Sequence, residues 1–200
     1  MRTFLALTLP ETCKESLAQV QKTLQLGEAS GVVRWVAPSQ FHLTLYFLGD
    51  SSEKQVSQWQ KDFAEWQATG KLQDCLQWGF QFEQIGVFPN WRKPSVLWVG
   101  LQSVVQAEMH TLYDFQRELA HLAQQYGYAS TPAFSPHITI GRVSRFASPA
   151  QQASLAQQIP KPHLPSTPTF QFSSLTLFAS ELRPSGAVYR KLASVVLNSA

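Results

Sequence analysis

Apolar and polar positions along this chain follow two periods. Eight short segments alternate apolar with polar residues or stay apolar throughout, as strands do: residues 2–9, 32–36, 41–48, 76–88, 95–101, 134–143, 170–181 and 187–197. Four longer segments repeat apolar residues every three or four positions, as helices do: residues 11–26, 51–68, 103–126 and 148–158. Pro10 and Gly27 bracket the first helix, and four prolines indicate an irregular crossover over residues 160–168.

The order of these segments predicts an α+β protein. The strands are mostly neighbours in sequence and the helices are interspersed among them, so mainly antiparallel sheets are expected. The chain has 200 residues, of which 44% are hydrophobic and 14% charged. This composition fits one domain, over residues 1–200, with a substantial core.

One tetrapeptide occurs twice, nearly unchanged, inside two of the predicted strands. His42-Leu43-Thr44-Leu45 is repeated about half a chain length later as His137-Ile138-Thr139-Ile140. Side chains alternate between the two faces of a strand, so each histidine shares a face with its threonine while the aliphatic residues point into a core. The repeat therefore predicts two related lobes that bring the two His-x-Thr pairs face to face.

A pair of facing histidines suits general acid–base chemistry at phosphorus. One neutral imidazole can take a proton from water while a second, protonated imidazole gives a proton to the leaving oxygen. The threonine hydroxyls can donate hydrogen bonds to the phosphoryl oxygens, where negative charge builds in the transition state. A single His-x-Thr on a strand is usually an ordinary structural pair, but two copies with the same apolar framing favour a functional site. No such pattern surrounds the other histidines, His110, His121 and His163.

Composition narrows the expected partners and setting. The net charge of +3 and the pI near 9.0 permit an anionic ligand such as a nucleotide or RNA without requiring one. Cys13 and Cys75 lack metal or redox spacing, and no acidic cluster accompanies the motifs, so neither a metal nor a cofactor is expected. No run reaches the ~18 apolar residues of a membrane span, and the first strand lacks a signal-peptide cleavage site. We therefore expect a cytoplasmic monomer without a membrane partner.

The paired motif resembles the signature of a known superfamily, the two-histidine (2H) phosphoesterases. The sequences around the motifs are similar to those of the bacterial RNA 2′,3′-cyclic phosphodiesterases, which are also called 2′-5′ RNA ligases; the similar segments are residues 34–49, 134–142, 4–10 and 182–189. The resemblance covers nearly the whole chain. The motifs are specific for the superfamily, and the flanking sequences are moderately specific for the branch.

This resemblance implies a bilobal fold with two pseudo-symmetric, mainly antiparallel sheets, flanking helices and a central cleft. It implies metal-independent hydrolysis of RNA or nucleoside 2′,3′-cyclic phosphate ends to a 2′-phosphate, without a cofactor. By microscopic reversibility, weak 2′-5′ joining of RNA ends follows. Carried over to this chain, His42 and His137 become the acid–base pair, and Thr44 and Thr139 become the phosphate-binding hydroxyls. We favour His42 as the acid and His137 as the base, although the near-symmetry of the motifs leaves the reverse open.

Three further candidates are Arg142, Phe47 and Tyr46. Arg142 stands where the branch has a phosphate-contacting arginine, but strict alternation puts it opposite His137 unless a bulge or bend at Gly141 relieves this. A solvated charge at the strand end is the alternative. Phe47 resembles a base-stacking residue of the branch, although alternation turns it toward the core and puts Tyr46 on the histidine face instead.

The same residues leave other functions open. A nucleotide- or RNA-binding module could keep the cleft without useful chemistry, although two intact His-x-Thr pairs favour an enzyme. A phosphodiesterase for another cyclic phosphate or for a 2′-5′ oligonucleotide fits equally well, because the motifs read the phosphoryl group and not the base. Three further residues could line the cleft, lie at its rim or pack in the core: Arg34, Trp35 and Tyr189. The loop Trp91-Arg92-Lys93 could contact RNA or be an incidental surface turn.

Overall fold

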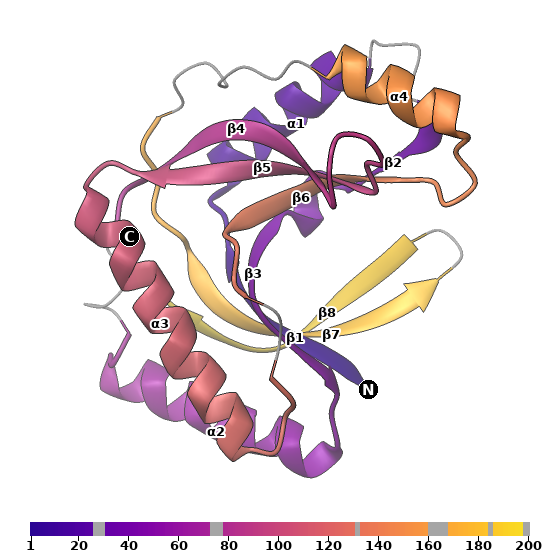
Figure 1. Ribbon diagram of the computed structural model, residues 1–200. Helices are drawn as coiled ribbons and strands as arrows, with labels where there is room; N and C mark the ends of the chain where they lie inside the picture. Colours follow the sequence, from indigo (N-terminus) through magenta and orange to yellow (C-terminus); the bar gives the residue numbers. More distant parts are fainter. Residues whose placement is uncertain (26–30, 73–77, 131–132, 160–167, 184–185, 198–200) are drawn as a thin grey trace.

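The computed structural model describes residues 1–25, 31–72, 78–130, 133–159, 168–183 and 186–197 (Figure 1). Its strands and helices follow the predicted order, with most boundaries within a few residues. They are β1 (Arg2–Thr8), α1 (Glu11–Gln25), β2 (Val33–Trp35), β3 (His42–Asp50), α2 (Glu53–Thr69), β4 (Phe80–Phe88), β5 (Val96–Ser103), α3 (Gln106–Gln125), β6 (His137–Val143), α4 (Pro149–Gln158), β7 (Ser174–Arg183) and β8 (Gly186–Val196). The predicted helix end at Gly27 and nearly all of the predicted crossover at 160–168 lie outside the described residues.

All strand pairs in these residues are antiparallel and belong to one sheet. The order is β4-β5-β6-β3-β1-β7-β8, and β2 also pairs with β6. Figure 1 shows two halves: β2, β4, β5 and β6 lie in the upper half with α1 and α4, and β1, β3, β7 and β8 lie in the lower half with α2 and α3. The predicted α+β class is confirmed.

The two expected sheets are joined at one narrow point. The strands β3 and β6 share a single register pair, Leu43 with Ile138, and each then continues into its own half. Bulges occur in both strands just beyond this pair. A bulge bends a strand and increases its twist, which separates the two halves without breaking the sheet between them.

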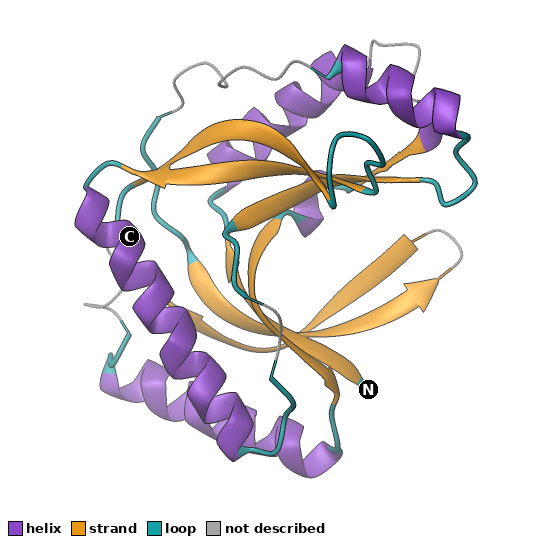
Figure 2. Cartoon of the chain, in the orientation of Figure 1, coloured by secondary structure: helices purple, strands orange, loops and turns teal. Residues whose placement is uncertain are grey.

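The helices lie on the outside of the sheet (Figure 2). In α2, the Ser52 hydroxyl accepts a hydrogen bond from the Gln55 backbone N–H at 3.3 Å, and the Gln55 side chain accepts one from the Ser52 N–H at 2.9 Å. Gly70, with φ of 67°, ends the helix in the left-handed region. The apolar repeat predicted over residues 51–68 forms a buried face of this helix, which consists of Val56, Trp59, Phe63 and Trp66.

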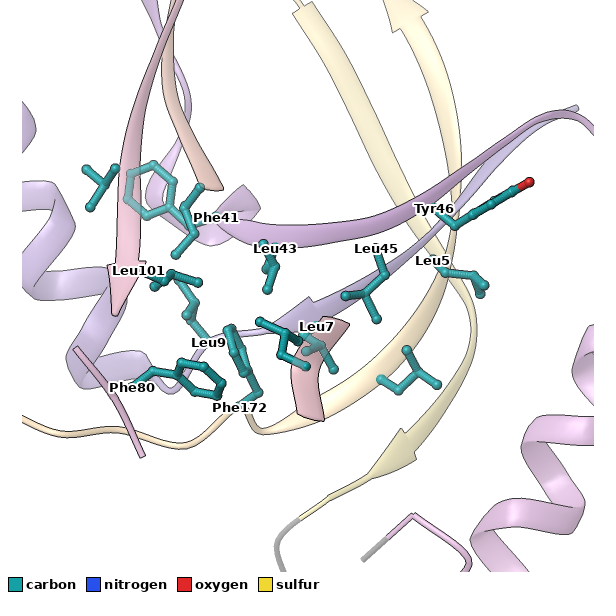
Figure 3. Packing of buried hydrophobic residues seen from close by; sticks show 14 of the residues in the cluster. Leu5, Leu7, Leu9, Phe41, Leu43, Leu45, Tyr46, Phe80, Leu101 and Phe172 are labelled. Atoms are coloured by element: carbon teal, nitrogen blue, oxygen red, sulfur yellow. The ribbon is translucent and has the colours of Figure 1, made fainter. Parts of the chain in front are cut away.

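A continuous hydrophobic core fixes which way the motif strand faces (Figure 3). Leu43 and Leu45 of β3 are buried with Leu5 and Leu7 of β1, and Phe172 packs in the same cluster. A shift of one residue along β3 would turn these leucines to solvent and the motif's polar side chains into the core. The core therefore determines that His42 and Thr44 project from the opposite face.

Candidate active site

The two His-x-Thr pairs line one cleft. The register pair of Leu43 with Ile138 makes the motif strands neighbours, and the histidine and threonine of each motif reach the same cavity of about 490 Å³. The described lining of this cavity holds three arginines and no carboxylate. The structure thus brings together the four motif residues that the repeat singles out: His42, Thr44, His137 and Thr139.

A bulge on β6 turns Arg142 into the cleft. One step along β5 corresponds to two steps along β6 at this point, so Ile140 is an extra residue. An extra residue reverses the alternation that follows it. Gly141 consequently stays buried, and Arg142 lines the cleft with His137 and Thr139. The conflict between strict alternation and a cleft position for Arg142 is resolved by this bulge.

An equivalent bulge on β3 exchanges the roles of two aromatic residues. Its extra residue is Leu45, as the register with β1 shows. Tyr46 therefore faces the core, where it is 2% exposed and donates a hydrogen bond to the carbonyl of Ala129 at 2.8 Å. Phe47 is 61% exposed and lines the cleft. The alternation argument that puts Tyr46 on the histidine face is wrong, because the bulge shifts the phase of the strand.

The two motifs are therefore related beyond their histidines and threonines. In both strands the bulge nearest the motif histidine falls on the fourth residue, counting that histidine as the first, and the sixth residue turns into the cleft. That sixth residue is Phe47 on β3 and Arg142 on β6. The cleft is consequently symmetric in its histidines and threonines. It is asymmetric at Phe47 and Arg142, with an aromatic ring on one strand and a cation on the other.

Both imidazoles are held by the same kind of hydrogen bond. Nδ1 of His42 lies 2.7 Å from the carbonyl oxygen of Gln40, and Nδ1 of His137 lies 2.7 Å from that of Ser135. A carbonyl oxygen only accepts, so Nδ1 carries the proton in each ring. Nε2 is then the nitrogen that remains for chemistry, as an acceptor in the neutral ring and a donor in the protonated ring.

Aromatic side chains pack against each histidine. The His42 ring centroid lies 5.0 Å from that of Phe4 and 5.3 Å from that of Tyr189. The His137 centroid lies 4.9 Å from that of Phe88, at an edge-on angle of 84°. These contacts restrict the rotation of both imidazoles and withdraw them from water.

Burial lowers the pKa of both histidines. Desolvation is the largest cause at each ring, and it is partly offset by the hydrogen bond to the backbone carbonyl. The positive charge of Arg142 lowers the pKa of each ring further, and the pKa of His42 falls from 6.5 to about 4. A bound anion would act in the opposite direction and raise the pKa of both histidines.

Other candidates from the sequence divide between cleft and core. Arg34 and Tyr189 line the cleft, whereas the ring of Trp35 packs over Gly141, 3.3 Å from where a Cβ atom would stand. In the loop between β4 and β5, Trp91 packs against the core. Cleft residues that no sequence pattern indicates include Arg2, Phe4 and Phe88. Of these, only the charge of Arg2 at the head of an apolar strand is a visible signal.

The described residues hold no group of three or more His, Cys, Asp or Glu side chains arranged like metal ligands. Cys13 is a buried free thiol, and Cys75 lies outside the described residues. Within the same part of the chain, no helix has both the length and the apolar composition to cross a membrane.

Comparison with known protein families shows the family to which this chain belongs. The family described as LigT like phosphoesterase matches residues 7–98 and 104–189, which include both motifs. The chain belongs to the LigT-like phosphoesterases. It is therefore a phosphoesterase of the 2H superfamily, as its paired motifs imply.

Named relatives of this LigT-like phosphoesterase match it over nearly its whole length. An RNA 2′,3′-cyclic phosphodiesterase of Methanothermobacter thermautotrophicus is 30% identical over 193 residues, covering 94% of this chain and 95% of its own. One from Thermotoga maritima is 26% identical, covering 96% and 93%. The crystal structure of E. coli LigT complexed with 3′-AMP has a TM-score of 0.68 at 23% identity, covering 99% and 98%, and it shares the fold.

Proposed function

We propose that this protein hydrolyses 2′,3′-cyclic phosphate ends of RNA or nucleosides to 2′-phosphates, without a metal ion. The observation that carries the proposal is the pair of equivalent imidazoles, each with Nδ1 bound to a carbonyl, beside two threonines in one cleft. Names of the relatives support the substrate class, since they are called RNA 2′,3′-cyclic phosphodiesterases.

The reaction needs two proton transfers, one at each side of phosphorus. Water attacks phosphorus and gives its proton to Nε2 of the neutral histidine. The P–O3′ bond breaks, and O3′ takes a proton from Nε2–H of the other histidine. The product keeps the P–O2′ bond and has a free 3′-hydroxyl. With a 5′-hydroxyl end as the nucleophile in place of water, the same two proton transfers give a 2′-5′ linkage and a free 3′-hydroxyl.

The remaining cleft residues match the rest of the substrate. The hydroxyls of Thr44 and Thr139 can donate to the non-bridging oxygens, whose charge increases in the transition state. Arg142 adds a cation at the same strand end. The exposed ring of Phe47 offers a stacking surface for the terminal base, which every base can use because each has a π-face.

The geometry does not distinguish the acid from the base, because both rings present Nε2 in the same way. From the sequence, we favour His42 as the acid and His137 as the base. The pKa of His42, lowered to about 4, opposes this assignment in the free enzyme, because a ring that is mostly neutral near neutral pH seldom carries the proton that the acid must donate. A substrate whose leaving group needs no acid can show which histidine is the acid and which is the base.

The lowered pKa values predict that turnover is favoured at acidic pH. An acid–base pair works when one ring is neutral and the other protonated, so kcat/KM peaks between the two pKa values of the free enzyme. Both lie below 6.5, so above about pH 6.5 kcat/KM should fall about tenfold per pH unit. In contrast, kcat should persist to higher pH, because the bound phosphate raises both pKa values. A kcat/KM maximum on the alkaline side of neutrality would contradict this.

The direct test is hydrolysis of uridine 2′,3′-cyclic phosphate and of a short RNA with a 2′,3′-cyclic end, in EDTA. We expect a 2′-phosphate as the only product, identified by ³¹P NMR or by chromatography against both isomers. A 3′-phosphate product would mean that P–O2′ breaks instead. A folded protein that binds nucleotides but turns over neither substrate would favour the binding-module alternative, or a phosphodiesterase for another ester.

A further inference from the structure

Three arginines line the cleft, which is more positive charge than one cyclic phosphate requires. Arg142 stands beside the second motif, and Arg34 and Arg2 belong to the same lining. A cyclic phosphodiester carries one negative charge, which Arg142 and the threonine hydroxyls are placed to receive. In the described part of the chain, no carboxylate forms an ion pair with any of the three arginines. Two guanidinium groups of the cleft are thus not matched by the reacting group.

The placement of Arg34 is unfavourable unless an anion binds there. Arg34 on β2 lies directly opposite Arg142 on β6 in the strand register, and both side chains are exposed in the cleft. Cross-strand partners are about 5 Å apart at Cβ, and like charges at such positions destabilise a sheet. The guanidinium of Arg34 also extends toward Gly186, at the start of β8, which brings positive charge to the rim between the two halves.

We propose that Arg34 and Arg2 bind internucleotide phosphates, so that the cleft prefers a single-stranded RNA with a terminal cyclic phosphate over a cyclic mononucleotide. For the identity of the terminal group, this inference rests on the proposed function. Arg34 acts from β2 in the upper half and Arg2 from β1 in the lower half, while Arg142 serves the reacting phosphate. A mononucleotide has no phosphates for the first two to bind.

Contacts of this kind have a characteristic dependence on salt. Phosphate contacts add affinity without reading the base, and each neutralised phosphate releases counterions. For single strands, the slope of log K against log salt concentration is about −0.7 per phosphate neutralised. Removing one arginine that binds a phosphate should therefore lower both the affinity and the magnitude of this slope.

The test compares Arg34→Gln and Arg2→Gln with the wild type in direct binding. The probes are a fluorescent oligouridylate that ends in a 2′-phosphate, followed by anisotropy, and uridine 2′-phosphate, followed by calorimetry. Each variant should bind the oligonucleotide on the order of tenfold more weakly, with its salt slope reduced by about 0.7. Affinity for uridine 2′-phosphate should not change. The matched control is Arg117→Gln, an exposed arginine of α3, which should alter neither affinity.

Two results would overturn the proposal. An equal loss of affinity for both probes would place the arginine at the terminal phosphate, and unchanged oligonucleotide binding would remove it from the RNA path. Thermal unfolding controls for folding, and Arg34→Gln should unfold at or above the wild-type temperature because a like-charge pair is removed. Binding requires no turnover, so a wild type that hydrolyses no cyclic phosphate would count against the proposed function and leave this test valid.

Discussion

Replacing either cleft histidine with alanine should lower kcat on uridine 2′,3′-cyclic phosphate by about 10²–10⁴-fold. In the proposed mechanism each ring handles one of the two proton transfers through Nε2, and the described cleft lining contains no carboxylate that could take over. The variants should remain folded, since each ring makes a single hydrogen bond, to a backbone carbonyl. Initial rates, with circular dichroism to verify folding, make the measurement.

The chain offers matched controls for this result. His110 and His121 are exposed histidines of α3 that do not line the cleft. Their alanine variants should keep the wild-type rate, which separates loss of an imidazole in general from loss of one in the cleft. Near-wild-type turnover of His42→Ala or His137→Ala would exclude the acid–base pair.

A sulfur substitution separates the acid from the base. In a cyclic substrate with sulfur in place of O3′, the leaving thiolate needs little help from an acid, whereas the attacking water still needs a base. The variant that lacks the acid should then recover most of its rate relative to wild type, and the variant that lacks the base should not. Recovery of His42→Ala would identify His42 as the acid, and recovery of His137→Ala would identify His137 as the acid.

Replacing Arg142 and replacing Phe47 should affect the kinetics in different ways. Arg142→Gln removes the cation that we propose to lie beside the reacting phosphate, so we expect kcat/KM to fall about 10²-fold, mostly through kcat. Phe47→Ala removes a stacking surface worth about 1–3 kcal/mol per base. Its KM should rise about tenfold, with kcat nearly unchanged. Steady-state kinetics on the same cyclic nucleotide distinguish the two effects.

The loop that follows β6 supplies a control for each change. Arg145 and Phe146 are exposed, with the Arg145 guanidinium 4.7 Å from the ring centroid of Phe146, and neither lines the cleft. Arg145→Gln and Phe146→Ala should leave both kinetic constants near their wild-type values. If Arg142→Gln changed only KM, Arg142 would bind the ground state and the transition state equally and would not contribute to the chemical step.

This pair of residues gives a nearly symmetric cleft a direction. The histidines and threonines alone would accept a cyclic phosphate in two orientations related by the pseudo-symmetry. In the proposed function, the aromatic ring on β3 offers a surface to the base, and the cation on β6 offers a charge to the phosphate. We therefore expect one productive orientation, and with it one regioisomer of the product.

Much of this architecture was accessible from the sequence, because it depends on local patterns. The apolar face of α2, from Val56 to Trp66, repeats at the helical period, and its burial follows from that repeat. The alternation of His42-Leu43-Thr44-Leu45 fixes the polar face of β3 as far as Thr44, since a strand in regular register has only two faces. The second copy of the motif made a shared cleft the natural expectation.

The sequence by itself determined the helices and strands and the two His-x-Thr pairs, because hydrophobic period and a repeated motif are properties of short segments. The tertiary structure alone decided what lies beyond the fourth residue of each motif. The bulges at Leu45 and Ile140 arise where a strand must bend between its neighbours, and they depend on the register with β1 and β5. They bury Tyr46, expose Phe47 and bring Arg142 to the histidines. Strand pairing likewise places Arg34 opposite Arg142, a contact between segments more than a hundred residues apart in the chain.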